Sequence, residues 1–140
     1  MKGRKIHYRV PDAAPSPKSV RYSHCVEADG WLHVSGQLPV DPDAADAAAP
    51  LGVEAQSELC FLNLQRIISH AGYGFSDTVF VRVYLADFDR DFPKFNEVYH
   101  RYFDDDEVMP SRTTFGVAKL GRNALVEIDM TLYRAASRSA

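Results

Sequence analysis

Cysteine is scarce in this chain of 140 residues, and the chain has neither a cluster of basic residues nor a long apolar run. The two cysteines, Cys25 and Cys60, lie far apart and outside any C-x-x-C pattern, so they indicate neither a zinc site nor a disulfide framework. A net charge of -3 gives no electrostatic basis for binding a phosphate backbone. The basic start, Met1–Lys5, leads into proline-rich sequence instead of an apolar signal segment. We therefore expect a soluble, cytoplasmic protein with no nucleic-acid or membrane partner.

Length and composition favour one globular domain spanning residues 1–140, because 46% of the residues are hydrophobic and the chain is too short for two ordinary cores. Residues 1–19 are expected to form an N-terminal edge strand over 5–10 and a proline-rich loop over 11–17. The five histidines show no metal-ligand spacing on a common element, so no metal site is predicted.

The clearest local pattern is a β-hairpin. Asp29-Gly30 separates two β-rich runs, 22–28 and 31–35, and this dipeptide suits a tight type I′ turn. We expect His33 to pack or bond within this hairpin, and Cys25 to be a buried thiol instead of a nucleophile. An Asp/Ala/Pro stretch over 40–50 follows and is interpreted as a surface loop.

Two helices and a strand are predicted next. Apolar positions recur at helical spacing over 53–71, and Gly72 supplies the stop. Residues 77–86 are rich in β-branched and aromatic side chains, which predicts a largely buried strand reached by a parallel crossover. Asp89 or Asp91 can cap a second helix whose aromatic stripe is interpreted as core. The acidic run 104–107 is expected to be a loop.

The last part of the chain predicts a second hairpin, in which the strand beginning near Arg112 and the strand 124–132 are joined by a Gly121-Arg122-Asn123 link. Alternation turns Glu127 away from the apolar side of its strand and suggests that Arg112 shares the polar face with it. The element order is then β-β-β-α-β-α-β-β, an α+β two-layer domain with two helices on one face of a mixed sheet. The other face, of mixed character, suits a subunit interface.

Four fragments in this order resemble the RidA/YjgF/UK114 family of small enamine and imine deaminases. They are Trp31-Leu32-His33-Val34-Ser35-Gly36-Gln37-Leu38-Pro39, Asn96-Glu97-Val98-Tyr99, Pro110-Ser111-Arg112-Thr113-Thr114 and Val126-Glu127-Ile128. The resemblance covers nearly the whole chain after about residue 20. It implies a chorismate-mutase-like α+β fold assembled as a homotrimer, with sites in the clefts between subunits.

The resemblance also implies a set of site residues. Arg112 matches the arginine that binds the substrate carboxylate, and a guanidinium fork can meet both carboxylate oxygens. Thr114 matches a position, often cysteine, whose backbone helps to hold that carboxylate, and Glu127 matches the acid that positions water. Further lining positions of the family match Tyr22, Gly36 and Asn96. The implied reaction converts a 2-imino acid to a 2-keto acid and ammonia without metal, flavin or pyridoxal cofactor, in keeping with metabolite damage control.

Other interpretations stay open at this point. Arg112 and Glu127 could form a solvated cross-strand ion pair of little energetic value, and Tyr22 could be ordinary strand filler. The family also allows a non-catalytic trimer that binds small carboxylates or acts as a chaperone, and an endoribonuclease or translation inhibitor, against which the missing basic patch weighs. Val20-Arg21 stands where many relatives have Gly-Pro before the tyrosine, which bears on substrate range.

Overall fold

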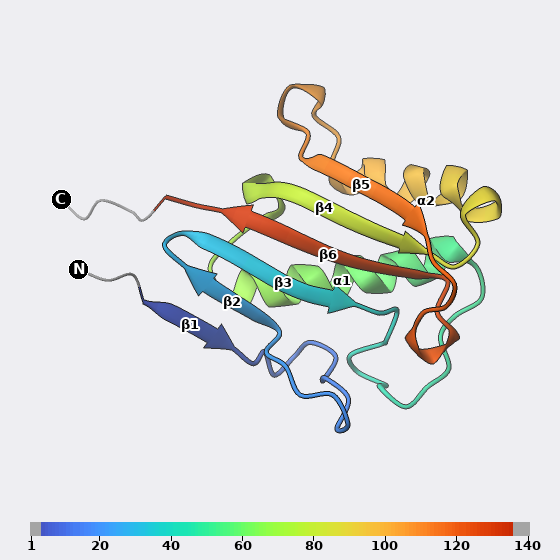
Figure 1. Ribbon diagram of the computed structural model, residues 1–140, viewed down its shortest axis with the longest axis horizontal. Coiled ribbons are helices and arrows are strands. Elements are labelled where there is room, and N and C mark those ends of the chain that lie inside the picture. The colour runs from blue at the N-terminus through green and yellow to red at the C-terminus, as the bar shows by residue number, and fades with distance from the viewer. Residues whose placement is uncertain (1–3, 136–140) are drawn as a thin grey trace.

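The structure is a computed structural model that describes residues 4–135 (Figure 1). The remaining parts of the predicted domain, 1–3 and 136–140, lie outside the described residues. Its strands and helices, in chain order, are β1 (Lys5–Tyr8), β2 (Cys25–Ala28), β3 (Trp31–Gln37), α1 (Val53–His70), β4 (Thr78–Leu85), α2 (Phe88–Tyr102), β5 (Ser111–Gly116) and β6 (Val126–Tyr133). The predicted element order is therefore confirmed.

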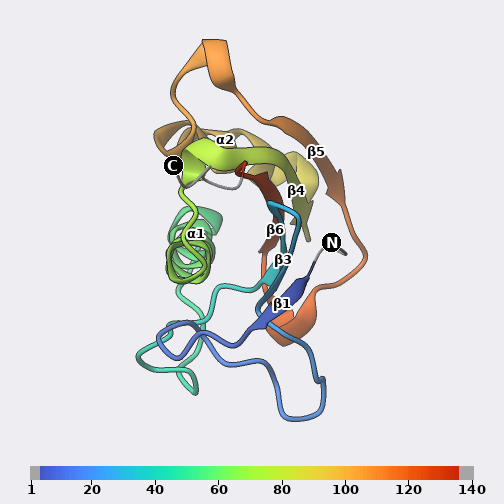
Figure 2. The same cartoon turned by 90° about the vertical axis from the view of Figure 1, so that its left-hand side faces the viewer.

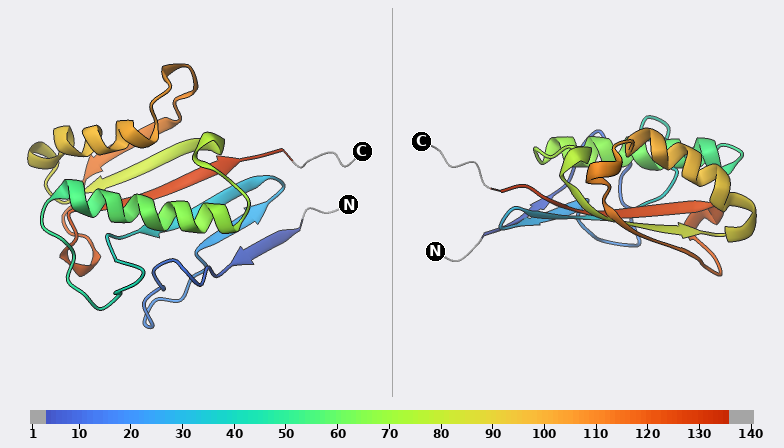
Figure 3. Two further views of the ribbon diagram at one scale, coloured as in Figure 1. Left: turned by 180° about the vertical axis from the view of Figure 1, so that it is seen from behind. Right: turned by 90° about the horizontal axis from the view of Figure 1, so that it is seen from above.

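The strands form one mixed sheet in the order β1-β2-β3-β6-β4-β5, with all pairings antiparallel except the parallel pair β4/β5. Both helices lie on one face of this sheet and the other face is uncovered (Figures 2 and 3). This confirms the predicted α+β two-layer class. The parallel crossover is also confirmed, because β3 and β4 both run antiparallel to β6, which lies between them.

The first hairpin has the predicted turn. Asp29 and Gly30 both have positive φ, 52° and 87°, as a type I′ turn requires. A side chain at Gly30 would also run into the backbone oxygen of Arg134. The paired part of the first strand begins only at Cys25, so Tyr22 lies in the loop before it.

Each helix ends or begins at a local signal. Gly72, with φ of 89°, ends α1 as predicted, since the N–H of Tyr73 donates to the oxygen of Ile68 in a Schellman-type closure. The predicted cap of α2 is wrong. The side chain of Asp87 accepts from the N–H of Arg90, so the cap lies two residues before Asp89 and four before Asp91. Phe88, in the first turn, stacks on Phe92.

The aromatic stripe of α2 is core, as predicted. Phe95 and Tyr99 are buried between the sheet and α1, and Phe61 of α1 stacks on Tyr102 with 4.2 Å between ring centroids. Aromatic pairs of this kind add to the stabilisation from apolar burial. This packing fixes α2 against the edge of the sheet where β5 lies.

The predicted second hairpin is wrong. Strand β4 lies between β5 and β6, which are not paired with each other. The link between them spans residues 117–125 and includes a short 3-10 turn at Gly121–Asn123. It is long enough to pass around the end of β4, whereas a three-residue link would have forced direct pairing. Because β5 is parallel to β4 and placed by α2, it occupies the outer edge of the sheet.

Candidate functional site

Arg112 lies on the helix-covered face of the sheet. In the register of the β4/β5 pair it stands opposite Val81, and Thr114 stands opposite Val83; both valines are fully buried under the helices. The guanidinium of Arg112 packs on three rings of α2, with its central carbon 4.4 Å from the centroid of Tyr99 and further contacts to Phe95 and Phe92. Such stacking favours the cation and holds it in place.

Two hydrogen bonds orient the guanidinium. Its Nε donates to Thr114 Oγ1 at 2.7 Å, and its Nη2 donates to Asn96 Oδ1 at 2.6 Å. Burial lowers the pKa of Arg112, although an arginine stays charged at any physiological pH. A guanidinium has five N–H donors, so about three remain free for another acceptor. The arrangement is a rigid, half-buried cation with its unused donors available to a carboxylate or similar anion.

Glu127 lies on the opposite, uncovered face. It stands across from Tyr84 in the register of β4 and β6, while its neighbours Val126 and Ile128 are fully buried on the helix side. A Cβ added at Gly36 would collide with the Glu127 carboxylate, so this glycine leaves the space that the carboxylate occupies. Tyr22, Gly36 and Glu127 line one hollow on this face of the sheet. Burial raises the pKa of Glu127, and the charge of Asp129 raises it further.

Asp129 is held by two donors beside Glu127. Tyr84 donates its hydroxyl proton to Asp129 Oδ2 at 2.7 Å, and Arg82 donates from Nε to the same oxygen at 3.1 Å. The Asp129 side chain is 8% exposed, and burial together with this bond raises the pKa of Tyr84 to about 12. Asp129 is therefore a fixed negative charge two residues along the strand from Glu127.

The prediction that Arg112 and Glu127 share a sheet face is wrong, and so is the interpretation of the two as an ion pair. Arg112 faces the helices, whereas Thr113 and Phe115 of the same strand face the open side, opposite Arg82 and Tyr84. The alternation in β5 was ambiguous, because the inward side could have been the one with Phe115 or the one with Arg112. Arg112 takes the inward position because its guanidinium stacks on the aromatic side chains of α2. The six predicted residues therefore form two groups, Arg112, Thr114 and Asn96 on one side and Glu127, Gly36 and Tyr22 on the other.

A buried histidine fixes the loop that leads to Tyr22. His24 Nδ1 accepts the N–H of Val10 at 2.8 Å, so its Nε2–H is free to donate to the oxygen of Ala14, also at 2.8 Å. Ala14 in turn donates to Asn63 of α1. Sequence reasoning missed this histidine and also missed Arg82, Tyr84 and Asp129. Among these residues, only Asp129 had a signal in the sequence, because residues two positions apart on a strand lie on the same face and Asp129 stands at i+2 from Glu127.

Two other sequence predictions concern single side chains of the first hairpin. His33 pairs with Val26 across the first hairpin, as predicted, and its ring also bonds to Thr131 of β6 at 3.2 Å. Cys25 is buried, as expected, and burial raises the pKa of its thiol to about 12.

Among residues 4–135, no group of three or more His, Cys, Asp or Glu side chains could hold a metal ion. No helix in this part of the chain is long and apolar enough to cross a membrane.

A family model described as Endoribonuclease L-PSP matches residues 12–133. A RutC family protein of Pyrococcus horikoshii is 34% identical over 121 residues, which are 86% of this chain and 92% of that protein. A protein of Mus musculus named 2-iminobutanoate/2-iminopropanoate deaminase is 36% identical over 108 residues, 77% of each chain.

Solved structures of the same shape include RidA from a Psychrobacter species, with a TM-score of 0.82, 31% identity and coverage of 92% of this chain and 99% of that one. A structure of E. coli TdcF with bound serine has a TM-score of 0.83 at 27% identity and covers 93% of this chain and 99% of that one.

Proposed function

Because the chain belongs to the RidA/YjgF family, described in the family model as endoribonuclease L-PSP, we propose that it is a deaminase of 2-imino acids. The observation that carries the proposal is the half-buried guanidinium of Arg112, which has free donors and a geometry fixed by Asn96, Thr114 and three aromatic rings. A small 2-imino acid presents one carboxylate, the group that such a fork binds in two-point fashion.

The reaction is a hydrolysis with no redox change. A 2-aminoacrylate-type enamine first tautomerises to the imine by moving a proton from nitrogen to carbon. Water then adds through its oxygen to the imine carbon while the nitrogen gains a proton, which gives a carbinolamine. The carbon–nitrogen bond breaks, ammonia leaves, and the hydroxyl loses its proton to become the carbonyl of a 2-keto acid. Water accounts for the new oxygen, and the original nitrogen leaves as ammonia.

Glu127 is the proposed group that manages the proton. As a carboxylate it accepts a hydrogen bond from the attacking water, and its raised pKa makes it a better proton acceptor than an ordinary glutamate. Free imines already hydrolyse in water, so orientation plus one acid/base group, worth about 10²- to 10⁴-fold, would be enough. Tyr22 and Gly36 line the hollow in which this step would take place.

One chain cannot present both groups to one small substrate. Arg112 is on the helix face of β5, Glu127 is on the open face of β6, and β4 lies between these strands. On the open face, Tyr84 stands between Glu127 and Phe115 in the strand register, and its ring packs edge to face on Phe115 with 4.9 Å between centroids. The proposed site is therefore shared, with Arg112, Thr114 and Asn96 of one subunit facing Glu127, Tyr22 and Gly36 of the next. A cyclic homotrimer with three such clefts is the assembly we propose.

The first experiment is a coupled assay. An amino-acid oxidase generates 2-iminopropanoate or 2-iminobutanoate in situ, and ammonia or keto-acid release is followed above the rate without the protein. We expect a clear acceleration by the wild type and a loss of most of it, about 100-fold, in Arg112→Ala and Glu127→Gln. A wild-type rate equal to the spontaneous rate for both imines would refute the deaminase proposal.

The second experiment tests the shared site. Arg112→Ala and Glu127→Gln subunits are mixed in equal amounts, dissociated and reassembled. A cleft is complete only where a subunit that keeps Arg112 precedes one that keeps Glu127, so random assembly restores about a quarter of the wild-type activity. Each variant reassembled alone is the control. If the mixture stays as inactive as its parents while light scattering shows mixed trimers, both groups act within one subunit and the shared-cleft proposal fails.

A second candidate function is binding of a small carboxylate without turnover. It is favoured by the Arg112 group, which is formed completely on one chain and does not depend on Glu127. The relative TdcF was solved with bound serine, a small carboxylate. Calorimetric binding of a 2-keto acid by a wild type that accelerates no imine hydrolysis would support this candidate over the deaminase.

A further inference from the structure

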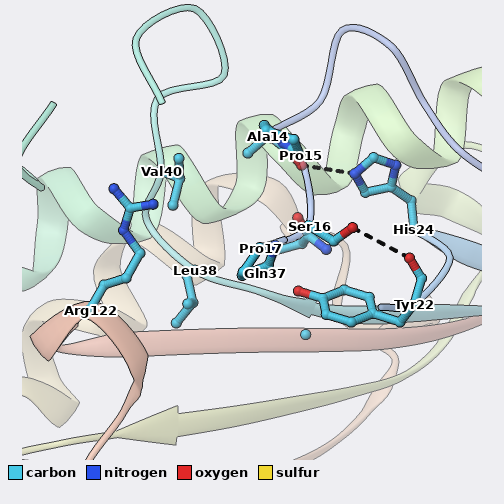
Figure 4. Close-up of a pocket in the computed structure, with 11 residues that line it drawn as sticks. Ala14, Pro15, Ser16, Pro17, Tyr22, His24, Gln37, Leu38, Val40 and Arg122 are labelled. Carbon is cyan, nitrogen blue, oxygen red and sulfur yellow. Dashed lines mark hydrogen bonds between the residues drawn. The ribbon is translucent and has the colours of Figure 1, made fainter. Parts of the chain in front are cut away.

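A second hollow, which we call the chamber, lies behind Tyr22, between the proline-rich loop and the segment that follows β3 (Figure 4). Its walls are mainly apolar, and its lining includes Pro15, Pro17, Leu38 and Val40. Figure 4 shows the Tyr22 ring entering from one side and Arg122 standing at the opposite side. The proposed function described above leaves this hollow and Arg122 without a role.

Arg122 is held at this position by an unusual backbone. Both Arg122 and Asn123 are in the left-handed region, with φ of 59° and 53°; asparagine adopts this region readily, whereas an arginine there costs free energy. Such conformations persist where the surrounding structure imposes them, and they concentrate at ligand-binding positions. The guanidinium of Arg122 is further fixed by a bond from its Nη2 to the backbone oxygen of Ala45 at 2.8 Å.

The charge of Arg122 is not neutralised by an ion pair in the described part of the chain, where every salt bridge within 4.0 Å involves other residues. Asp46 borders a neighbouring hollow that Arg122 also lines, yet the two form no ion pair. Arg122 therefore offers a fixed positive charge with unused N–H donors at the end of an apolar chamber.

This chamber adjoins the hollow over Glu127. Tyr22, Gly36 and Leu38 line both, so the ring of Tyr22 stands between the place of the proposed water attack and Arg122. A substrate fixed through its carboxylate and imine carbon has only its side chain left to extend. The apolar walls of the chamber suit methylene groups, and its far end suits an anion.

We infer that the chamber behind Tyr22 receives the side chain of the imine, and that Arg122 selects side chains ending in a carboxylate. The preferred substrates are then imines of dicarboxylic amino acids, such as 2-iminosuccinate and 2-iminoglutarate. This inference rests on the proposed deaminase function and adds the substrate class to it. Arg122 acts as a specificity residue, while Arg112 still binds the carboxylate next to the imine.

The test compares kcat/KM for 2-iminoglutarate with kcat/KM for the imine of leucine, which has a branched side chain of similar size without charge. Wild type should favour 2-iminoglutarate, and Arg122→Gln should lower the ratio of the two values by about 10- to 100-fold, the usual effect of losing one hydrogen bond to a charged group. Arg122→Lys keeps the charge and should retain part of the preference. Arg66→Gln is the control, because it removes another arginine that donates to a backbone oxygen and does not line the chamber.

Arg122→Gly guards against misfolding, because glycine accepts the left-handed backbone without strain and should lower the ratio in the same way. Inhibition of 2-iminopropanoate hydrolysis by 2-oxoglutarate gives a second readout and should weaken in the same variants. If the wild type accelerates no imine at all, the deaminase proposal has failed. If it hydrolyses 2-iminopropanoate but its preference between charged and neutral side chains is the same in Arg122→Gln, the deaminase stands and the role of Arg122 is refuted.

Discussion

Replacing Asp129 with asparagine should lower the pKa of Glu127 and move the acid limb of the activity profile to lower pH. Asparagine keeps an oxygen that can accept from Tyr84 and Arg82, so the local hydrogen bonds survive while the charge is removed. The negative charge of Asp129 opposes ionisation of Glu127. Without it, the carboxylate form of Glu127 becomes easier to reach.

The size of the effect follows from the strand geometry. Side chains two residues apart on one face are about 7 Å apart. Two charges at that distance repel by about 2.4 kcal/mol at an effective dielectric constant near 20 and by about 0.6 kcal/mol in water. Glu127 is only half-buried and Arg82 already offsets part of the charge of Asp129, so the lower part of this range applies. We expect the pKa of Glu127 to fall in Asp129→Asn by an amount that corresponds to the lower part of this energy range.

The assay is kcat/KM for 2-iminopropanoate between about pH 4 and pH 8, with the rate without protein subtracted at each pH. Activity should rise through the pKa of Glu127, since the carboxylate is the form that holds the water. The Asp129→Asn profile should rise earlier by the amount given above, whereas the control Asp43→Asn, at an exposed carboxylate paired with Arg66, should follow the wild type. An acid limb that stays in place, or moves to higher pH, would refute the coupling between the two carboxylates.

Two further predictions concern the same face of the sheet. Gly36→Ala should reduce kcat by about 10- to 100-fold because the added Cβ displaces the Glu127 carboxylate, whereas Gly74→Ala, whose Cβ would meet only Ser76 Oγ at 3.9 Å, should retain wild-type activity in the same assay. Equal activity in the two variants would contradict the role given to Gly36. Glu127→Gln should raise the thermal midpoint more at pH 7 than at pH 4, with a difference between the two changes on the order of 2 °C. A folded pKa above the unfolded one stabilises the fold at low pH and loses that contribution as pH rises through the folded pKa, so a gain confined to pH 4 would contradict the sign.

Local signals in the sequence predicted the elements that depend on local chemistry. Asp29-Gly30 fixes the first turn and Gly72 ends α1, because each requires a backbone conformation that few residues adopt. The alternation along 126–132 predicted the two faces of β6 correctly, since its inward positions are all aliphatic. These predictions needed no knowledge of what lies beside each element.

Long-range pairing was not predictable in the same way. No local sequence pattern indicates that β4 separates β5 from β6, and the Gly121-Arg122-Asn123 link suggested that β5 and β6 pair directly. The phase of β5 depends on α2, whose aromatic stripe gives Arg112 an inward position, and on Gly116, where a Cβ would crowd Phe88. The sequence predicted which residues could form a site, but only the packed structure shows how they divide between the two faces of the sheet.

That division connects the uncovered face of the sheet to the proposed chemistry. The open face presents Trp31 and Tyr133 in contact at one end, and it presents Glu127 beside Asp129 at the other. Exposed aromatic rings of this kind favour coverage by another protein surface. Covering the face with the β5 edge of a second copy would remove water from these rings and bring the donors of Arg112 to the carboxylate of Glu127. Apolar burial and completion of the cleft would then be the same event, so assembly itself would switch the proposed activity on.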